Sequence, residues 1–124
     1  MTQLGEIYVC DICGNIVEVV HASSGKLVCC GSPMTLQVEN TTDAAKEKHV
    51  PFVQKEGNRV SVQIGSTVHP MVANHYIEWI ELTQGDRVKR VYLKPGEEPK
   101  AEFCVNDGDF TVRAYCNLHG LWKV

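Results

Sequence analysis

The spacing of apolar and polar residues along the chain predicts short strands and no long helix. Apolar residues alternate with polar ones over residues 60–64 and 110–116. A period of two is the pattern of a strand with one buried face. Further strands are expected at residues 75–82, 87–93 and 101–105, separated by turns rich in Gly, Pro, Asn and Asp. Several short strands between turn signals predict an all-β sandwich.

The chain begins with a segment, up to about residue 37, that is too small for a stable hydrophobic core of its own. Short strands are expected at residues 6–10 and 15–20, on either side of a turn at Cys13. A segment of this size usually needs a metal, disulfides or a partner subunit to fold. A polar stretch at residues 39–48 then links it to the larger part of the chain.

Length, charge and composition narrow the class of protein. The 124 residues fit one ordinary domain, or a very small domain fused to a modest one. The net charge of −3, without a run of Lys and Arg, argues against nucleic acid as a partner. We see no signal peptide and no apolar run long enough to cross a bilayer, and we therefore expect a soluble, cytoplasmic protein.

Cysteine and histidine are segregated along the chain. Four of the six cysteines fall within the first 30 residues, and four of the five histidines come after residue 48. In a cytosolic protein, such clusters indicate metal or redox chemistry more often than disulfides. The sequence therefore predicts two separate metal sites.

The first predicted site has four cysteine ligands: Cys10, Cys13, Cys29 and Cys30. Adjacent residues in extended backbone point to opposite sides, so Cys29 and Cys30 can share one metal only if the backbone bends sharply. The site should then be distorted from an ideal tetrahedron. Structural zinc, two disulfides and a mononuclear electron-carrying iron are the alternatives, and the spacing by itself favours zinc.

The second predicted site draws on residues at strand ends and loops: His49, His69, His75, Cys116 and His119. Four imidazoles and one thiolate exceed what a tetrahedral zinc site needs. They suit a five-coordinate iron with sulfur on its axis and the sixth position available to a small ligand. Two residues are set aside: His21 as exposed, and Cys104 as a small buried strand residue. Asn117 and Leu118 are expected to tune the site through backbone N–H groups directed at the Cys116 sulfur.

The motifs in combination resemble desulfoferrodoxin, the two-iron class of superoxide reductase, over essentially the whole chain. Residues 1–37 resemble desulforedoxin and residues 38–124 resemble neelaredoxin. The motifs that carry the resemblance are Tyr8-x-Cys10-x-x-Cys13-Gly14-Asn15, Leu27-Val-Cys-Cys-Gly31, Glu47-Lys-His-Val-Pro51, Val68-His-Pro-Met71, His75-x-Ile-x-Trp79 and Tyr115-Cys-Asn-Leu-His-Gly120.

The resemblance implies two iron ions per chain and an immunoglobulin-like sandwich for the second domain. It implies a distorted rubredoxin-like iron on the four cysteines and a catalytic iron on the four histidines and Cys116. The reaction would be the one-electron reduction of superoxide to hydrogen peroxide. Lys48 would steer the anion and order protons, and Glu47 would occupy the sixth position at rest. A rubredoxin-like electron donor and a homodimer are also implied.

Four other functions remain as alternatives. A zinc ribbon fused to an immunoglobulin-like interaction domain would bind zinc and catalyse nothing. A dismutase or a peroxidase would use the same iron differently, and a pure electron carrier would show neither activity. The four-cysteine iron could relay electrons, or it could only hold the small domain and the dimer together.

Overall fold

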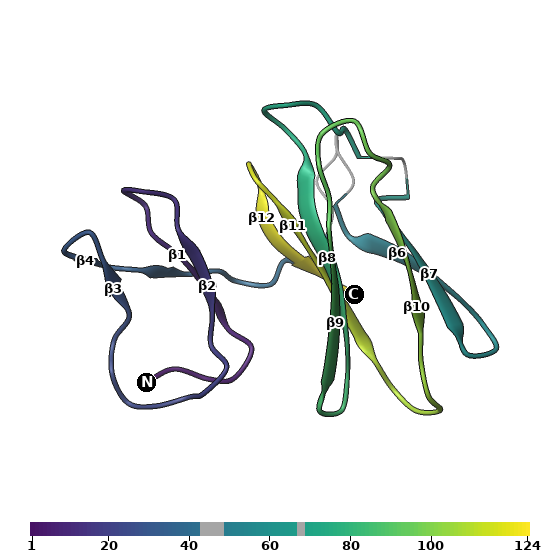
Figure 1. The fold of residues 1–124 in the computed structure, drawn as a ribbon, viewed down its shortest axis with the longest axis horizontal. Coiled ribbons are helices and arrows are strands. Elements are labelled where there is room, and N and C mark those ends of the chain that lie inside the picture. The colour runs from purple at the N-terminus through teal and green to yellow at the C-terminus, as the bar shows by residue number, and fades with distance from the viewer. Residues whose placement is uncertain (43–48, 67–68) are drawn as a thin grey trace. The chain divides into compact units, whose positions relative to one another are not determined.

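The computed structural model of the protein has two compact units, Met1–Val38 and Glu39–Val124. The residues it describes are 1–42, 49–66 and 69–124. The two units are drawn in Figure 1 from purple at the N-terminus to yellow at the C-terminus. No helix in the described part of the chain has the length and apolar character needed to cross a bilayer.

Short antiparallel strands make up the first unit. The three-stranded sheet has the order β2-β1-β5, with β1 (Ile7–Val9), β2 (Ile16–Glu18) and β5 (Thr35–Leu36). A second pair joins β3 (Val28–Cys29) to β4 (Ser32–Pro33). Within this unit the buried apolar residues are Ile7, Cys10 and Val19. So few buried side chains cannot stabilise a fold by themselves, which agrees with the need for a metal or a partner.

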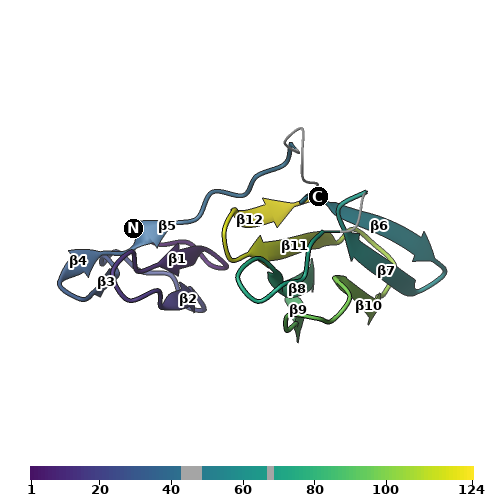
Figure 2. The same ribbon diagram turned by 90° about the horizontal axis from the view of Figure 1, so that it is seen from above.

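The second unit consists of two antiparallel sheets, seen from two directions in Figure 1 and Figure 2. The first sheet has the order β10-β7-β6, with β6 (Pro51–Glu56), β7 (Arg59–Ile64) and β10 (Lys100–Cys104). The second has the order β12-β11-β8-β9, with β8 (Ile77–Gln84), β9 (Arg87–Tyr92), β11 (Thr111–Cys116) and β12 (Gly120–Lys123).

One core lies between these sheets, and the alternating residues supply it. The buried side chains from the first sheet are Val60, Val62, Ile64, Ala101 and Phe103, and those from the second are Ile77, Ile80, Leu82, Val112, Ala114 and Cys116. Burial of each large aliphatic side chain stabilises the fold by about 1.5–3 kcal/mol. The predicted all-β class and the β-sandwich are confirmed.

Some details of the strands differ from the prediction. β6 shows little alternation because most of its side chains are half-buried or exposed, and it lies at a sheet edge with proline as its first residue. β8 begins at Ile77, and His75 lies before it in an isolated bridge with Val72. Cys104 is exposed, so the expectation that it is buried is wrong. Ala101 and Phe103 take the core face of β10, and Cys104 therefore points outward.

A buried carboxylate lies on the other face of the four-stranded sheet. Glu81 alternates with Ile80 and Leu82 and is only 1% exposed. It accepts hydrogen bonds from Arg90 Nη2 at 3.1 Å and Arg113 Nη2 at 3.2 Å. These two cations compensate the cost of burying its charge, and they tie β8 to β9 and β11.

Candidate metal centres

The four cysteines predicted as ligands lie together at one end of the first unit. Their sulfur atoms are all within 4.8 Å of one another. Cys29 Sγ lies 3.6 Å from Cys13 Sγ and 3.9 Å from Cys30 Sγ. Four thiolates about 2.3 Å from one tetrahedral metal are about 3.8 Å apart, whereas a disulfide is about 2.0 Å long. The spacing fits a metal ion, and all of these cysteines are free, which argues against disulfides.

A left-handed backbone conformation brings the adjacent cysteines to one side. Cys30 has φ of 55°, and it is the one non-glycine residue with positive φ among the described residues. Gly31 follows with φ of 74°. Such a conformation costs energy for a residue with a side chain and marks functional sites. This is the sharp bend that adjacent ligands require.

The sulfur atoms have opposite tendencies to ionise. Hydrogen bonds from the backbone, first of all from Cys13 N at 3.4 Å, lower the pKa of Cys10 to about 6. Hydrogen bonding with neighbouring sulfurs, first of all that of Cys13, raises the pKa of Cys30 to about 12. One thiolate therefore forms readily, and further negative charge in the cluster requires a cation. The cluster fits a bound metal ion on electrostatic grounds as well.

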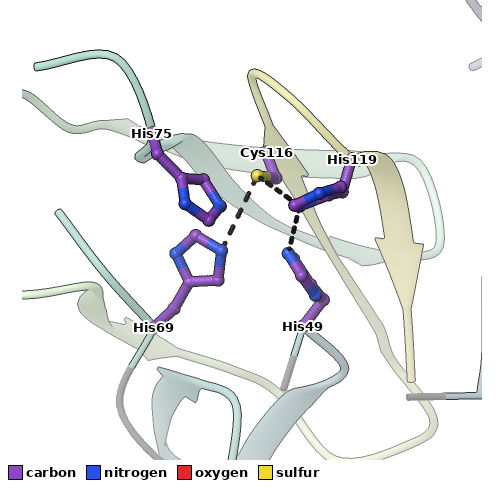
Figure 3. Close-up of side chains that lie close together, drawn as sticks. All are labelled: His49, His69, His75, Cys116 and His119. Carbon is purple, nitrogen blue, oxygen red and sulfur yellow. Dashed lines mark hydrogen bonds between the residues drawn. The ribbon is translucent and has the colours of Figure 1, made fainter. Parts of the chain in front are cut away.

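The second cluster brings together all five residues predicted for it: His49, His69, His75, Cys116 and His119. Figure 3 shows the four rings directed toward one another, with the Cys116 sulfur beside them. His119 Nδ1 lies 3.1 Å from His49 Nε2, and the sulfur lies 3.6 Å from His69 Nε2 and 3.8 Å from His119 Nδ1. Adjacent nitrogens about 2.1 Å from a shared metal are about 3.0 Å apart. Four nitrogens and one sulfur thus fit a single metal ion.

The alternation of β11 places the sulfur. Cys116 follows Val112 and Ala114 on the buried face of the strand. The register with β8 shifts between Tyr115 and Cys116, and the extra residue of this irregularity is Glu78, on β8. The turn into β12 then carries His119 and ends at Gly120, whose φ of 85° favours glycine. Cys116 and His119 are consequently held by one hairpin.

Contacts around the rings fix their orientation. His69 Nδ1 lies 2.7 Å from the Pro70 carbonyl oxygen. Because a carbonyl can only accept, Nδ1 carries the proton, and the lone pair of Nε2 is directed into the cluster. Trp122 stacks on His49, and its Nε1 donates to the His119 carbonyl oxygen at 3.2 Å.

The five residues of the cluster differ in burial. Cys116 is fully buried, and His49 and His69 are also buried. His75 is half-buried and His119 is exposed. The sulfur is therefore shielded from water, and the two more exposed residues of the cluster are His75 and His119.

Not every residue singled out in the sequence belongs to these clusters. His21 is exposed, as predicted, and it is in neither group of ligands. Glu47 and Lys48 lie outside the described residues, so their roles stay predictions.

Family models match almost the whole chain. A model described as desulfoferrodoxin matches residues 41–124, and one described as the N-terminal domain of desulfoferrodoxin matches residues 2–37. The chain belongs to the desulfoferrodoxin family. The first model covers the five residues of the His/Cys cluster, and the second covers the four cysteines.

Individual members and a solved structure resemble the chain along its full length. A desulfoferrodoxin homolog of Archaeoglobus fulgidus is 58% identical over 123 residues, with 99% of this chain and 98% of the relative covered. The desulfoferrodoxin of Nitratidesulfovibrio vulgaris is 55% identical, with 95% of this chain and 94% of the relative covered. The superoxide reductase of Treponema pallidum has 26% identity and a TM-score of 0.78, with 96% of each chain covered.

Sequence reasoning missed two contacts in this member of the desulfoferrodoxin family. The stacking of Trp122 on His49 depends on how β12 pairs with β11. Local sequence patterns do not predict this pairing. Asn117 N was expected to point at the Cys116 sulfur, but it donates to the Tyr76 carbonyl oxygen at 3.2 Å. The position of Asn117 in a turn could have predicted its role, because asparagine side chains in turns often form hydrogen bonds with the backbone.

Proposed function

We propose that the chain is a superoxide reductase that acts at the His/Cys cluster. The observation that carries the proposal is a set of four imidazoles and one buried thiolate converging on one point. A tetrahedral zinc site takes four ligands and not five, whereas imidazole and thiolate together suit iron. The name of the Treponema pallidum relative supports the same activity.

The reaction is the reduction of superoxide by one electron, with uptake of two protons, to give hydrogen peroxide. Iron bound by the cluster would supply one-electron redox chemistry, and an external donor would provide the electron that each turnover consumes. We assign the ligand roles to His49, His69, His75, His119 and Cys116. The four cysteines of the first unit, Cys10, Cys13, Cys29 and Cys30, hold the second iron of the chain.

The residues of the cluster have distinct tasks. Cys116 donates electron density from its buried side, and its burial keeps water from competing for the sulfur. The hydrogen bond to the Pro70 carbonyl fixes the His69 tautomer and increases its basicity as a ligand. The exposed edge at His119 admits the small anion from solvent.

Two residues next to His49 in the sequence complete the proposal. Lys48 attracts the superoxide anion by its positive charge and raises the rate of encounter. Glu47 supplies the carboxylate that occupies the sixth position between turnovers. Both assignments come from the resemblance of the Glu47-Lys-His49 motif.

The remaining proposals concern the surroundings of the enzyme. A small reduced carrier of the rubredoxin type is the electron donor. Two copies of the chain form a homodimer, which is supported by the exposed apolar side chains of the first unit: Leu4, Ile12, Val17, Val20 and Val28. Six cysteines, none of them in a disulfide, favour the reducing cytoplasm as the location.

Product stoichiometry tests the activity. A reductase yields one peroxide for each superoxide and consumes the donor, whereas a dismutase yields half as much and consumes none. Metal analysis of the same preparation separates both from a zinc-binding module, which would be colourless and free of iron. One peroxide per superoxide with two irons per chain is the expected result. A purified protein that contains zinc and has no activity toward superoxide would contradict the proposal.

Steering by Lys48 has its own test. Lys48→Ile should slow the reaction with superoxide and flatten its dependence on ionic strength, because screening then acts on a smaller attraction. Lys46→Ile removes the same charge two residues earlier and is the matched control. Equal salt dependence in Lys48→Ile and the unmodified protein would show that Lys48 does not steer the anion.

A further inference from the structure

Asn117 joins the two loops that carry three residues of the His/Cys cluster. It lies in the turn between Cys116 and His119. Its side-chain Oδ1 accepts a hydrogen bond from Tyr76 N at 2.9 Å, and its Nδ2 donates to the Asn74 carbonyl oxygen at 3.1 Å. One carboxamide thus bonds to the backbone on both sides of His75.

These bonds continue the pairing of β8 and β11 beyond its end. The last paired residues are Cys116 and Ile77, and Asn117 N then donates to the Tyr76 carbonyl oxygen at 3.2 Å. Past this point the backbone of β11 turns away into the hairpin, so it cannot pair further. The carboxamide has the same donor and acceptor as a peptide group, and it takes over the pairing as far as Asn74.

The opposite side of the His75 loop is also held. Val72 N donates to the His75 carbonyl oxygen at 3.0 Å, and His75 N donates to the Val72 carbonyl oxygen at 3.1 Å. The backbone from Asn74 to Tyr76 therefore lies between Val72 and Asn117. Val72 connects only residues of the same loop, whereas Asn117 connects that loop to the hairpin of Cys116 and His119.

We propose that Asn117 is a positioning residue that fixes the His75 imidazole relative to Cys116 and His119. It acts through backbone on either side of His75 and contacts no reacting atom. The proposal rests on the proposed function in one respect, that these residues bind iron. Groups that orient metal ligands typically change metal affinity or activity by roughly 10–100-fold when they are removed. Asn117 meets the geometric requirement for such a group.

The test compares two alanine variants in neighbouring positions. Asn117→Ala removes both side-chain hydrogen bonds, whereas Asn74→Ala removes an exposed side chain and keeps the carbonyl that Asn117 uses. Each purified two-iron protein is mixed with a ferrous chelator, and iron loss is followed separately for the two sites. The four-cysteine site of the same chain is an internal control, because its ligands belong to the first compact unit and Asn117 to the second.

Two readouts other than activity accompany the chelation. The first is the energy of the thiolate-to-iron charge-transfer band, which reports the ligand geometry at Cys116. The second is hydrogen exchange of the Tyr76 amide in the metal-free protein, which reports the bond to Asn117 Oδ1 directly. Asn117→Asp keeps that acceptor and loses the donor to Asn74, and it also serves if the alanine variant does not fold.

We expect Asn117→Ala to lose iron from the His/Cys site roughly 10-fold faster than Asn74→Ala, with a shifted band and faster Tyr76 exchange. Asn117→Asp should retain slow Tyr76 exchange. If Asn117→Ala matches Asn74→Ala in iron loss and in the band, the positioning role is overturned. Failure of the proposed function can be distinguished from failure of the positioning role, because the unmodified protein would then be inactive toward superoxide. The Tyr76 exchange and metal loss would still be measurable in that case, with a zinc indicator if zinc occupies the site.

Discussion

The indole ring of Trp122 stacks on the imidazole of His49, with 4.6 Å between ring centroids and 16° between ring planes. The same indole donates from Nε1 to the His119 carbonyl oxygen at 3.2 Å. Trp122 pairs with Ala114 in the register of β12 and β11, which places it on the core face. One side chain therefore holds two residues of the His/Cys cluster through two different interactions.

Replacing Trp122 should separate these interactions. Trp122→Phe can still stack on His49 and loses only the bond to the His119 carbonyl, which we expect to cost about 1 kcal/mol. Trp122→Ala loses both and leaves a cavity, at a cost of about 3–5 kcal/mol. Urea unfolding gives the free energies, and chelation of iron gives the rate of loss from the cluster. Equal effects of the two substitutions would show that the stacking contributes nothing.

The buried Glu81 should be far more important to stability than exposed carboxylates. Glu81→Gln removes the charge that two arginines share, and breaking such a buried pair typically costs about 3–5 kcal/mol. Glu102→Gln is the matched control, because its partner Arg59 is 3.8 Å away and both side chains are about two-thirds exposed. The control should change stability by less than about 1 kcal/mol. Similar midpoints of urea unfolding for both variants would contradict this assignment.

The sequence predicted which cysteines and histidines lie together, because residue type and spacing carry that information. The segregation of cysteine from histidine, and the adjacency of Cys29 and Cys30, were sufficient to anticipate two clusters and a bent backbone. The contacts of Trp122, Glu81 and Asn117 depend on which strands pair and in what register. Register is set by the whole sheet, so single residues do not reveal it.

Iron at the four-cysteine site should be dispensable for the reaction if its role is structural. Cys13→Ser removes one thiolate from that site and leaves all five residues of the His/Cys cluster unchanged. We expect iron to fall from two ions to one per chain, with the rate of superoxide reduction within about twofold of the unmodified protein and a lower thermal midpoint for the first unit. A large fall in the rate, with the His/Cys iron still bound, would instead assign the four-cysteine iron to electron transfer.

The metal-free four-cysteine cluster should titrate in widely separated steps. Backbone hydrogen bonds lower the pKa of Cys10 to about 6, below its ordinary value of 9.0, so its thiolate is present at pH 7. Because the pKa is lowered by folding, the stabilisation is complete above the pKa of the unfolded chain and is lost as pH falls through about 6. Cys30 remains protonated at pH 7, since its pKa is raised to about 12, and it must release a proton when a metal binds.

Thiolate absorbance of the metal-free protein measures these steps. We expect one thiolate to form near pH 6 and to be missing in Cys10→Ser. Cys104→Ser is the control, because Cys104 is exposed and belongs to neither cluster; it should leave the low-pH step in place. Metal binding at pH 7 should release protons, and metal affinity should therefore rise with pH. A first thiolate that forms only near pH 9 would show that the backbone N–H groups around Cys10 do not stabilise its charge.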